Sequence, residues 1–148
     1  MSDQTDNLVT ALFSEIIIAD QLARARLTKA LPKGMEISHF AVLNHLAGLQ
    51  TERSPAQLAQ AFNLTRGAMT NTLHKLEDAG YIHIRPDWDD ARRKLVGISP
   101  AGMVARDTAL AAITPIMREV ADSIGVDRVK LVLPVLREIR QRLTRTDN

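Results

Sequence analysis

Residues 64–80 carry the clearest alternation of apolar and polar positions in the chain. The apolar positions recur at the spacing of an α-helix and form one stripe, which consists of Met69, Leu73 and Leu76. Thr65 can cap the start of such a helix by accepting hydrogen bonds from first-turn amides, and Gly80 can adopt the left-handed conformation that ends it. The pattern predicts an amphipathic helix with one side against a core.

The opposite face of this predicted helix is polar and able to form hydrogen bonds, rather than heavily charged. At about 100° per residue it contains Gly67, Asn71, His74 and Asp78, with Thr70 and Lys75 on its flanks. A face that meets only solvent more often carries Glu and Lys pairs, whereas Asn, Thr, Arg and His near a helix N-terminus suit base edges and phosphates. The candidate DNA-reading residues are Arg66, Gly67, Thr70, Asn71, His74 and Lys75.

A shorter helix is predicted just upstream. Ser54 and Gln57 have the spacing of a capping box, and Pro55 occupies the first helical position, where a missing N–H does no harm. The inward face is expected to consist of Leu58, Ala61 and Phe62. Two short helices joined by a tight turn, the second with a polar face, are typical of a helix-turn-helix, although other helical corners share this pattern.

A β-hairpin is predicted after the second helix. Residues 81–86 and 95–99 have strand character, and the polar loop between them ends in three consecutive basic residues. A charged hairpin alone is commonly a solvated turn, but its place directly after a helix-turn-helix favours the wing of a winged helix. The candidate DNA contacts therefore also include Arg92, Arg93 and Lys94 in the wing and Ser54, Gln57 and Thr65 at the helix starts.

Further helices are predicted on both sides of this region. They cover residues 8–31, residues 39–49 with Ser38 as a cap, a stretch from Ser99 and Pro100 to Gly125, and residues 127–145. Pro115 and Pro134 should disturb the last two. Glu52 and Arg53 are expected to add a short strand beside the wing.

The terminal helices are apolar over more surface than one neighbour could cover, which indicates a second subunit. We therefore expect one mainly α domain of the α+β class over residues 1–148. It would contain a winged helix-turn-helix DNA-binding lobe at about 37–100 and dimerisation helices at about 1–36 and 101–148.

Composition limits the other classes of function. The chain has no cysteine, which excludes disulfides and thiolate metal sites and is compatible with a reducing cytoplasm. Its formal net charge is only +2, so charge alone does not indicate a nucleic-acid partner. No signal peptide or membrane-length apolar run is visible, and we expect a cytoplasmic protein with no membrane partner.

Catalytic and metal chemistry find little support in the sequence. His39 and His45 are six positions apart, which misses the one-face spacings of a helix, and no HExxH pattern is present. No G-x-S-x-G elbow and no glycine-rich phosphate loop occurs. We expect no metal, no cofactor and no enzymatic activity.

The segment after the predicted reading helix resembles the MarR (multiple antibiotic resistance regulator) family of transcription factors. Members carry a leucine–glutamate pair and a glycine, then a wing reading D-x-R-D-x-R, then K-L-V-x-L-T-x-x-G. The matching residues are Leu76, Glu77, Gly80, Asp87, Asp90, Arg92, Lys94, Leu95, Val96, Ile98, Ser99 and Gly102. The wing departs from the family at Asp89, where the first arginine is usual, and at the neighbouring Trp88.

The resemblance implies a homodimer that binds double-stranded DNA at a pseudo-palindromic operator and represses transcription until an effector binds. Family effectors are often aromatic or phenolic acids held between the dimerisation helices and the DNA-binding lobe. Arg24, Arg26 and His39 would border such a cleft, although ordinary surface or interhelical roles are the simpler interpretation for each.

Two alternatives remain open at this stage. The winged helix could be a protein-interaction module without specific DNA binding, which would suit the acidic pair Asp89 and Asp90 in the wing. The interhelical cleft could also belong to a small-molecule carrier or enzyme, although no catalytic constellation supports this.

Overall fold

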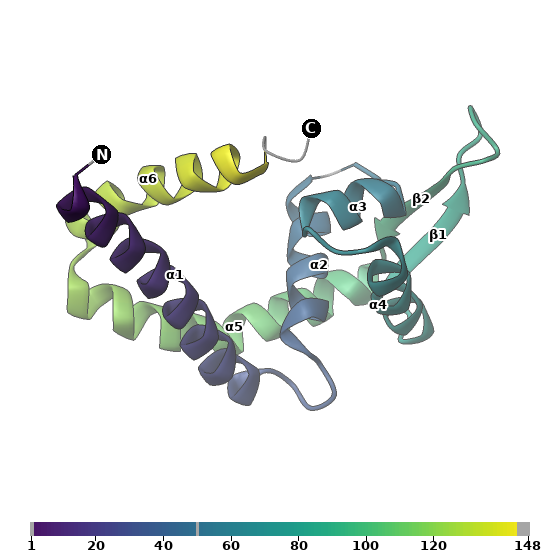
Figure 1. Ribbon diagram of the computed structural model, residues 1–148. Helices are drawn as coiled ribbons and strands as arrows, with labels where there is room; N and C mark the ends of the chain where they lie inside the picture. The colour runs from purple at the N-terminus through teal and green to yellow at the C-terminus, as the bar shows by residue number, and fades with distance from the viewer. Residues whose placement is uncertain (1, 50, 145–148) are drawn as a thin grey trace. The chain divides into compact units, whose positions relative to one another are not determined.

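The computed structural model describes residues 2–49 and 51–144 and is mainly helical, with one small antiparallel sheet. The elements are α1 (Asp3–Ala30), α2 (Ile37–Leu49), α3 (Pro55–Ala61), α4 (Arg66–Asp78), β1 (Ile82–Pro86), β2 (Lys94–Ile98), α5 (Pro100–Ile124) and α6 (Val126–Thr144) (Figure 1). This confirms the expected fold class. The chain divides into two compact units, residues 1–112 and 113–148, and the division falls within the sequence of α5.

The first helix begins earlier than the apolar pattern predicts. Ser2 caps α1, since its side chain accepts a hydrogen bond from the Thr5 N–H at 3.4 Å. Asp3 and Asp6 in the first turn add favourable charge at the positive end of the helix dipole. The expected start at Leu8 is therefore wrong, because polar capping residues rather than apolar ones begin this helix.

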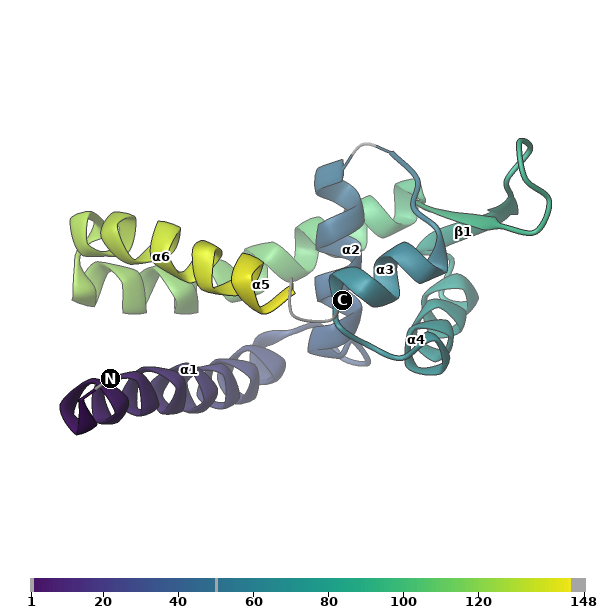
Figure 2. The ribbon, with the colours of Figure 1, turned by 45° about the horizontal axis from the view of Figure 1, so that its top comes forward.

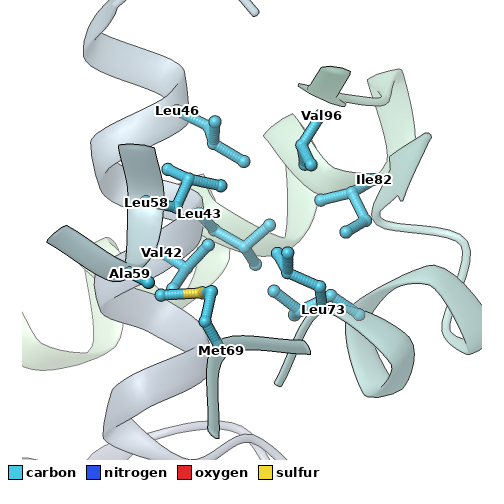
Figure 3. Close-up of a cluster of buried hydrophobic side chains, with 10 residues drawn as sticks. Val42, Leu43, Leu46, Leu58, Ala59, Met69, Leu73, Ile82 and Val96 are labelled. Carbon is cyan, nitrogen blue, oxygen red and sulfur yellow. The ribbon is translucent and has the colours of Figure 1, made fainter. Parts of the chain in front are cut away.

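The core lies between α2, the helix-turn-helix and the sheet. Each element contributes apolar side chains to one cluster, which consists of Val42, Leu43, Leu46, Leu58, Ala59, Met69, Leu73, Leu76, Ile82 and Val96 (Figure 3). Two local expectations about the helices around this core are wrong. The first concerns Ser38, which lies inside the first turn of α2 instead of capping it, because the helix begins at Ile37.

The second failed expectation concerns the inward face of α3. Ala59 is buried beside Leu58, whereas Ala61 is exposed. The core-facing side of this seven-residue helix is centred on Leu58 and Ala59, and Phe62, directly after the helix, packs against the same cluster, so Ala61 lies outside it. Its capping box is confirmed, with Ser54 accepting from the Gln57 N–H at 3.1 Å and Gln57 accepting from the Ser54 N–H at 2.9 Å.

The expected limits of α4 are confirmed. Thr65 is its N-cap and accepts from the Ala68 N–H at 3.1 Å. Gly80 has a φ of 80° just beyond the C-terminus, a conformation that suits glycine because it has no Cβ. Met69, Leu73 and Leu76 are buried, so the predicted stripe is the side of α4 that faces the core.

The hairpin pairs Ile82 with Ile98 and Pro86 with Lys94, close to the predicted strands. It extends beyond α3 and α4, which lie beside its base (Figures 1 and 2). Arg53 forms an isolated bridge with Val96, so the expected extra strand is reduced to one bridging residue. At the other end, Ser99 donates to the Gly80 carbonyl at 2.6 Å and ties the hairpin to the end of α4.

The second unit contains the end of α5 and all of α6. Gly125, with a φ of 103°, separates the two helices at the predicted position. Both Pro115 and Pro134 lie inside continuous helices. The expected end of the last helix at Arg145 lies outside the described residues.

Gly102 is a close-packing point in the first turn of α5. A Cβ built there would collide with the Tyr81 carbonyl oxygen and would lie 2.8 Å from a side-chain carbon of Ile98. Backbone cannot move away as a flexible side chain can. Glycine is therefore required for α5 to pack against the base of the hairpin.

We predict that Gly102→Ala lowers the free energy of unfolding by about 1–3 kcal/mol, because the added methyl overpacks a site closed by backbone. Gly48→Ala is the matched control. Gly48 is exposed in α2 with open space around its Cα, so alanine there should stabilise the helix by about 0.5–1 kcal/mol. Denaturant unfolding at equal protein concentration measures both changes. A neutral effect of Gly102→Ala would contradict the packing described above.

Candidate nucleic-acid interface

The predicted reading face of α4 is exposed along its whole length. Arg66, Gly67, Thr70, Asn71, His74 and Lys75 all lie on the solvent side. Leu73 and Met69, on the other side of the same helix, are at most 1% exposed. The helix therefore holds its polar side chains on a rigid support, which is the arrangement that specific contacts with base edges need.

A groove of about 420 Å³ separates α4 from the hairpin and brings several predicted site residues together. Thr70 and His74 line it from α4, and Lys94 lines it from β2. Arg85 of β1 and the acidic Glu77 of α4 complete its polar lining. The reading face and the wing thus form one continuous surface.

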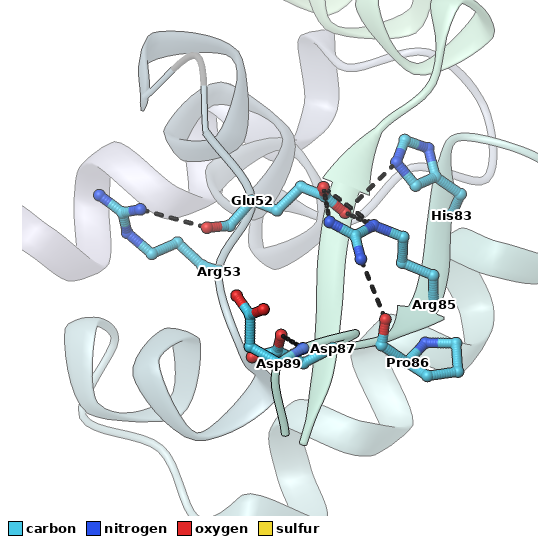
Figure 4. A network of polar contacts seen from close by, with 7 residues as sticks. All are labelled: Glu52, Arg53, His83, Arg85, Pro86, Asp87 and Asp89. Carbon is cyan, nitrogen blue, oxygen red and sulfur yellow. Dashed lines mark hydrogen bonds and ion pairs between the residues drawn. The ribbon is translucent and has the colours of Figure 1, made fainter. Parts of the chain in front are cut away.

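An ion pair that the sequence analysis missed fixes the base of the wing. Arg85 makes a bidentate contact with Glu52, in which Nη2 donates to Oε1 at 2.7 Å and Nε lies 3.0 Å from each oxygen (Figure 4). His83, two positions earlier on the same face of β1, lies 3.8 Å from the same carboxylate. Glu52 precedes α3, so this network joins the start of the helix-turn-helix to the hairpin.

The turn of the wing is held by its own aspartates. Asp87 accepts from the Asp89 N–H at 3.0 Å, and the Asp90 carboxylate accepts from the Arg92 guanidinium at 3.0 Å. Asp90 also accepts from the Arg92 backbone N–H. These hydrogen bonds from Arg92, aided by the charge of Arg93, lower the pKa of Asp90. Arg92 thus braces the turn while its side chain stays exposed.

Trp88 lies in the same turn and stacks on Arg85. The guanidinium carbon is 4.0 Å from the centre of the aromatic ring, a cation–π contact. In the sequence alone, Trp88 stands out only as a departure from the family pattern. The available signal was an arginine three positions before the tryptophan, at the end of a predicted strand.

The remaining predicted DNA contacts are helix caps. Ser54 is buried and its hydroxyl is engaged in the capping box of α3. Gln57 and Thr65 are exposed, and both also accept from backbone amides. Their roles as DNA contacts remain predictions.

The residues proposed to border an effector cleft have separate local surroundings. Arg24 is exposed and pairs with Asp20 one turn earlier on α1 at 2.9 Å. Arg26 is exposed on the same helix. His39 is buried at the start of α2, where its Nδ1 accepts from the Glu36 N–H at 3.3 Å.

His45 has a packing role. Its ring meets Phe62 edge-on, with the ring centres 5.2 Å apart. Burial, and then the nearby charge of Arg53, lower the pKa of His45, so its neutral form is favoured. Among the described residues, no group of three or more histidine, aspartate or glutamate side chains is arranged to hold a metal ion. Within residues 2–49 and 51–144, no helix combines the length and apolar character needed to span a bilayer.

We predict that Arg92→Met raises the pKa of Asp90, measured by NMR titration of its carboxyl carbon. The folded-state pKa is lowered, so the ionised carboxylate stabilises the turn at neutral pH, and this contribution is lost as the pH falls through that pKa. Arg93→Met is the control and should cause a smaller rise, because Arg93 acts only through its charge. Equal rises in the two variants would contradict the hydrogen-bonded brace.

Comparisons with known proteins agree with this geometry. Residues 33–93 match the model of the MarR family. The fold is similar to that of a mutant MarR from E. coli complexed with operator DNA, with a TM-score of 0.77 and 21% identity over 90% of this chain and 96% of that one.

Two further regulators have a similar fold. BldR from Sulfolobus solfataricus has a TM-score of 0.82 and 24% identity over 96% of this chain and 99% of that one. The organohalide-sensing regulator RdhR-CbdbA1625, bound to 2,4-dichlorophenol, has a TM-score of 0.79 and 18% identity over 95% of this chain and 83% of that one. These likenesses establish the winged-helix fold, and residues 33–93 are similar to the MarR family.

Proposed function

We propose that this protein is a transcription regulator that binds a pseudo-palindromic operator in duplex DNA as a homodimer. The exposed polar face of α4, held by the core and continuous with the wing, is the observation that carries the proposal. A helix of this size and polarity suits the major groove. The adjacent hairpin would then follow the backbone and the neighbouring minor groove.

The side chains of α4 divide into two proposed roles. Asn71 lies near the centre of the exposed face, and its amide can donate to and accept from one adenine edge. Arg66 and Lys75 lie nearer the edges of the face, where they suit phosphates. Thr70 and His74 line the groove toward the wing and complete the reading surface.

The homodimer is supported by apolar surface that the single chain leaves exposed. No residue of α1 or α6 is buried. The exposed large apolar residues of these helices are Leu8, Val9, Leu12, Phe13, Ile17, Ile18 and Leu22 in α1 and Val126, Leu131, Val132, Leu133, Val135, Leu136 and Leu143 in α6. Surface of this extent marks an interface. A two-fold dimer places two copies of α4 on related half-sites, which makes the operator pseudo-palindromic.

We further propose that the regulator is a repressor released by a small aromatic or phenolic acid. The similar structures with operator DNA and with 2,4-dichlorophenol support the binding of DNA and of a small aromatic ligand by a chain of the same fold. Arg24, Arg26 and His39 are the candidate effector contacts. An effector would act by changing the separation of the two copies of α4, since half-site spacing is set by the dimer.

We predict that Asn71→Ala weakens operator binding by about 1–3 kcal/mol and relaxes preference at one base pair of each half-site. Binding to scrambled duplex should change little. Arg93→Ala is the comparison, because Arg93 is exposed in the wing and carries charge without a base-reading amide. It should weaken both duplexes and flatten the dependence of log affinity on log salt.

The operator for this measurement comes from selection of genomic fragments bound by the protein. Equal loss on both duplexes with Asn71→Ala, together with altered base preference with Arg93→Ala, would contradict the proposed roles. Absence of salt-dependent duplex binding would instead favour the protein-interaction alternative.

A separate prediction concerns assembly. Ile17→Glu on α1 should shift the protein to monomer, because it places a charge in apolar surface that the partner covers; Ile17 is 58% exposed in the single chain. Gln4→Glu, at an exposed position toward the opposite side of α1, is the control for added charge on the same helix. Sedimentation equilibrium measures the mass of each variant. A dimeric Ile17→Glu protein would exclude this face of α1 from the interface.

A further inference from the structure

We propose that Trp88 is the wing residue that enters the minor groove of the bound duplex. The inference rests on the proposed function and names the contact that the wing makes. The ring is exposed, it is held in place by neighbouring side chains, and the turn around it has no net charge.

Trp88 is the only tryptophan of the chain and is 84% exposed, although tryptophan is among the most highly buried residue types on average. It lies at a hairpin turn, where a polar residue would serve solvation better. An aromatic ring there offers a large apolar surface to whatever the wing meets. Proteins that bind the minor groove commonly insert apolar side chains between base steps.

The ring is held in place by a chain of contacts that leads to the folded core. Arg85 lies under one face of the ring at 4.0 Å. Its guanidinium is fixed by Glu52 at 2.7 Å and also donates to the Pro86 carbonyl at 3.0 Å. The side chains of Arg85 and Glu52 are each only 28% exposed. Trp88 is therefore oriented before any ligand arrives, which lowers the entropy lost on binding.

The position of Arg85 connects Trp88 to the reading surface. Arg85 lines the groove that also contains Thr70 and His74 of α4. A ring stacked on Arg85 therefore continues the surface that α4 presents to DNA. When α4 occupies the major groove, the wing reaches toward the adjacent minor groove.

The charge of the turn favours an apolar contact over an electrostatic one. Residues 87–94 contain three acidic and three basic side chains, so the turn has no net charge. One of the basic side chains, Arg92, is paired with Asp90 at 3.0 Å. Insertion of an aromatic ring needs no net positive charge. Insertion is easiest at flexible pyrimidine–purine steps, because these unstack most readily. We therefore expect such a step in the operator at the position that Trp88 contacts.

The fluorescence of the single tryptophan tests the proposal directly in the full-length protein. On titration with operator duplex, Trp88 emission should change, and acrylamide should quench it less in the complex than in the free protein. Binding is confirmed in parallel by gel shift. Operator binding with unchanged emission and unchanged quenching would overturn the role of Trp88 while leaving the proposed function intact. Absence of any duplex binding would overturn both.

Two variants measure the contribution of the ring. Trp88→Ala should lower operator affinity about tenfold per half-site. In the complex about half of the tryptophan side chain would be buried against DNA, and the variant loses this burial. The slope of log affinity against log salt should not change, since no charge is removed. Trp88→Phe is the matched control and should retain most of the affinity. Wild-type affinity of Trp88→Ala would overturn the proposal.

A double-mutant cycle tests Arg85 as the positioning residue. Arg85→Met should weaken operator binding in the wild type and have a much smaller effect in the Trp88→Ala background, because its role is to hold the ring. Equal losses in the two backgrounds, with a flatter salt slope, would show that Arg85 contacts phosphate by itself. That result would overturn the positioning role.

Discussion

Burial of one side of α4 in a shared apolar cluster is the constraint on which the winged-helix lobe depends. A 13-residue helix is marginal by itself in water, so its stability must come from tertiary contacts. Leu43 and Leu58 are fully buried beneath it, and Met69 and Leu73 meet them from α4. Because this packing fixes the rotation of α4, the same contacts that stabilise the helix determine which of its side chains face outward.

Short-range rules predicted most of this lobe from the sequence. The Ser54–Gln57 box and Thr65 satisfy backbone groups within one turn, so each can be recognised from a few adjacent residues. The errors have local physical causes as well. Ser2 caps α1 in a segment without apolar periodicity, and α3 turns Leu58 and Ala59 toward the core in place of Ala61.

The ion pair between Glu52 and Arg85 shows where such rules end. The two residues are 33 positions apart, and neither belongs to an apolar pattern or a capping motif. Their contact exists because Arg53 pairs with Val96 and so places the segment before α3 alongside the sheet. The stacking of Trp88 depends on that contact in turn. The stacking of Trp88 thus requires two long-range contacts, Arg53 with Val96 and Glu52 with Arg85, and the periodicity of the sequence carries no information on either.

In the proposed regulator, sequence-specific binding to DNA requires dimerisation. One winged helix offers a small DNA interface, of the order of 600–1,000 Å² for a single module, and such an area gives limited discrimination between sequences. α1 and α6 carry apolar surface that the chain itself does not bury. When a second copy covers this apolar surface, the two α4 helices are physically linked. Once one α4 is bound, the other is held at a high effective concentration near the second half-site, and the overall affinity rises. The wing adds an apolar ring to the contacts of each half-site, beside the exposed charge of Arg93, while the turn around Trp88 has no net charge. Because the ring carries no charge, the affinity that it adds depends on the local stacking and shape of the duplex rather than on phosphate charge.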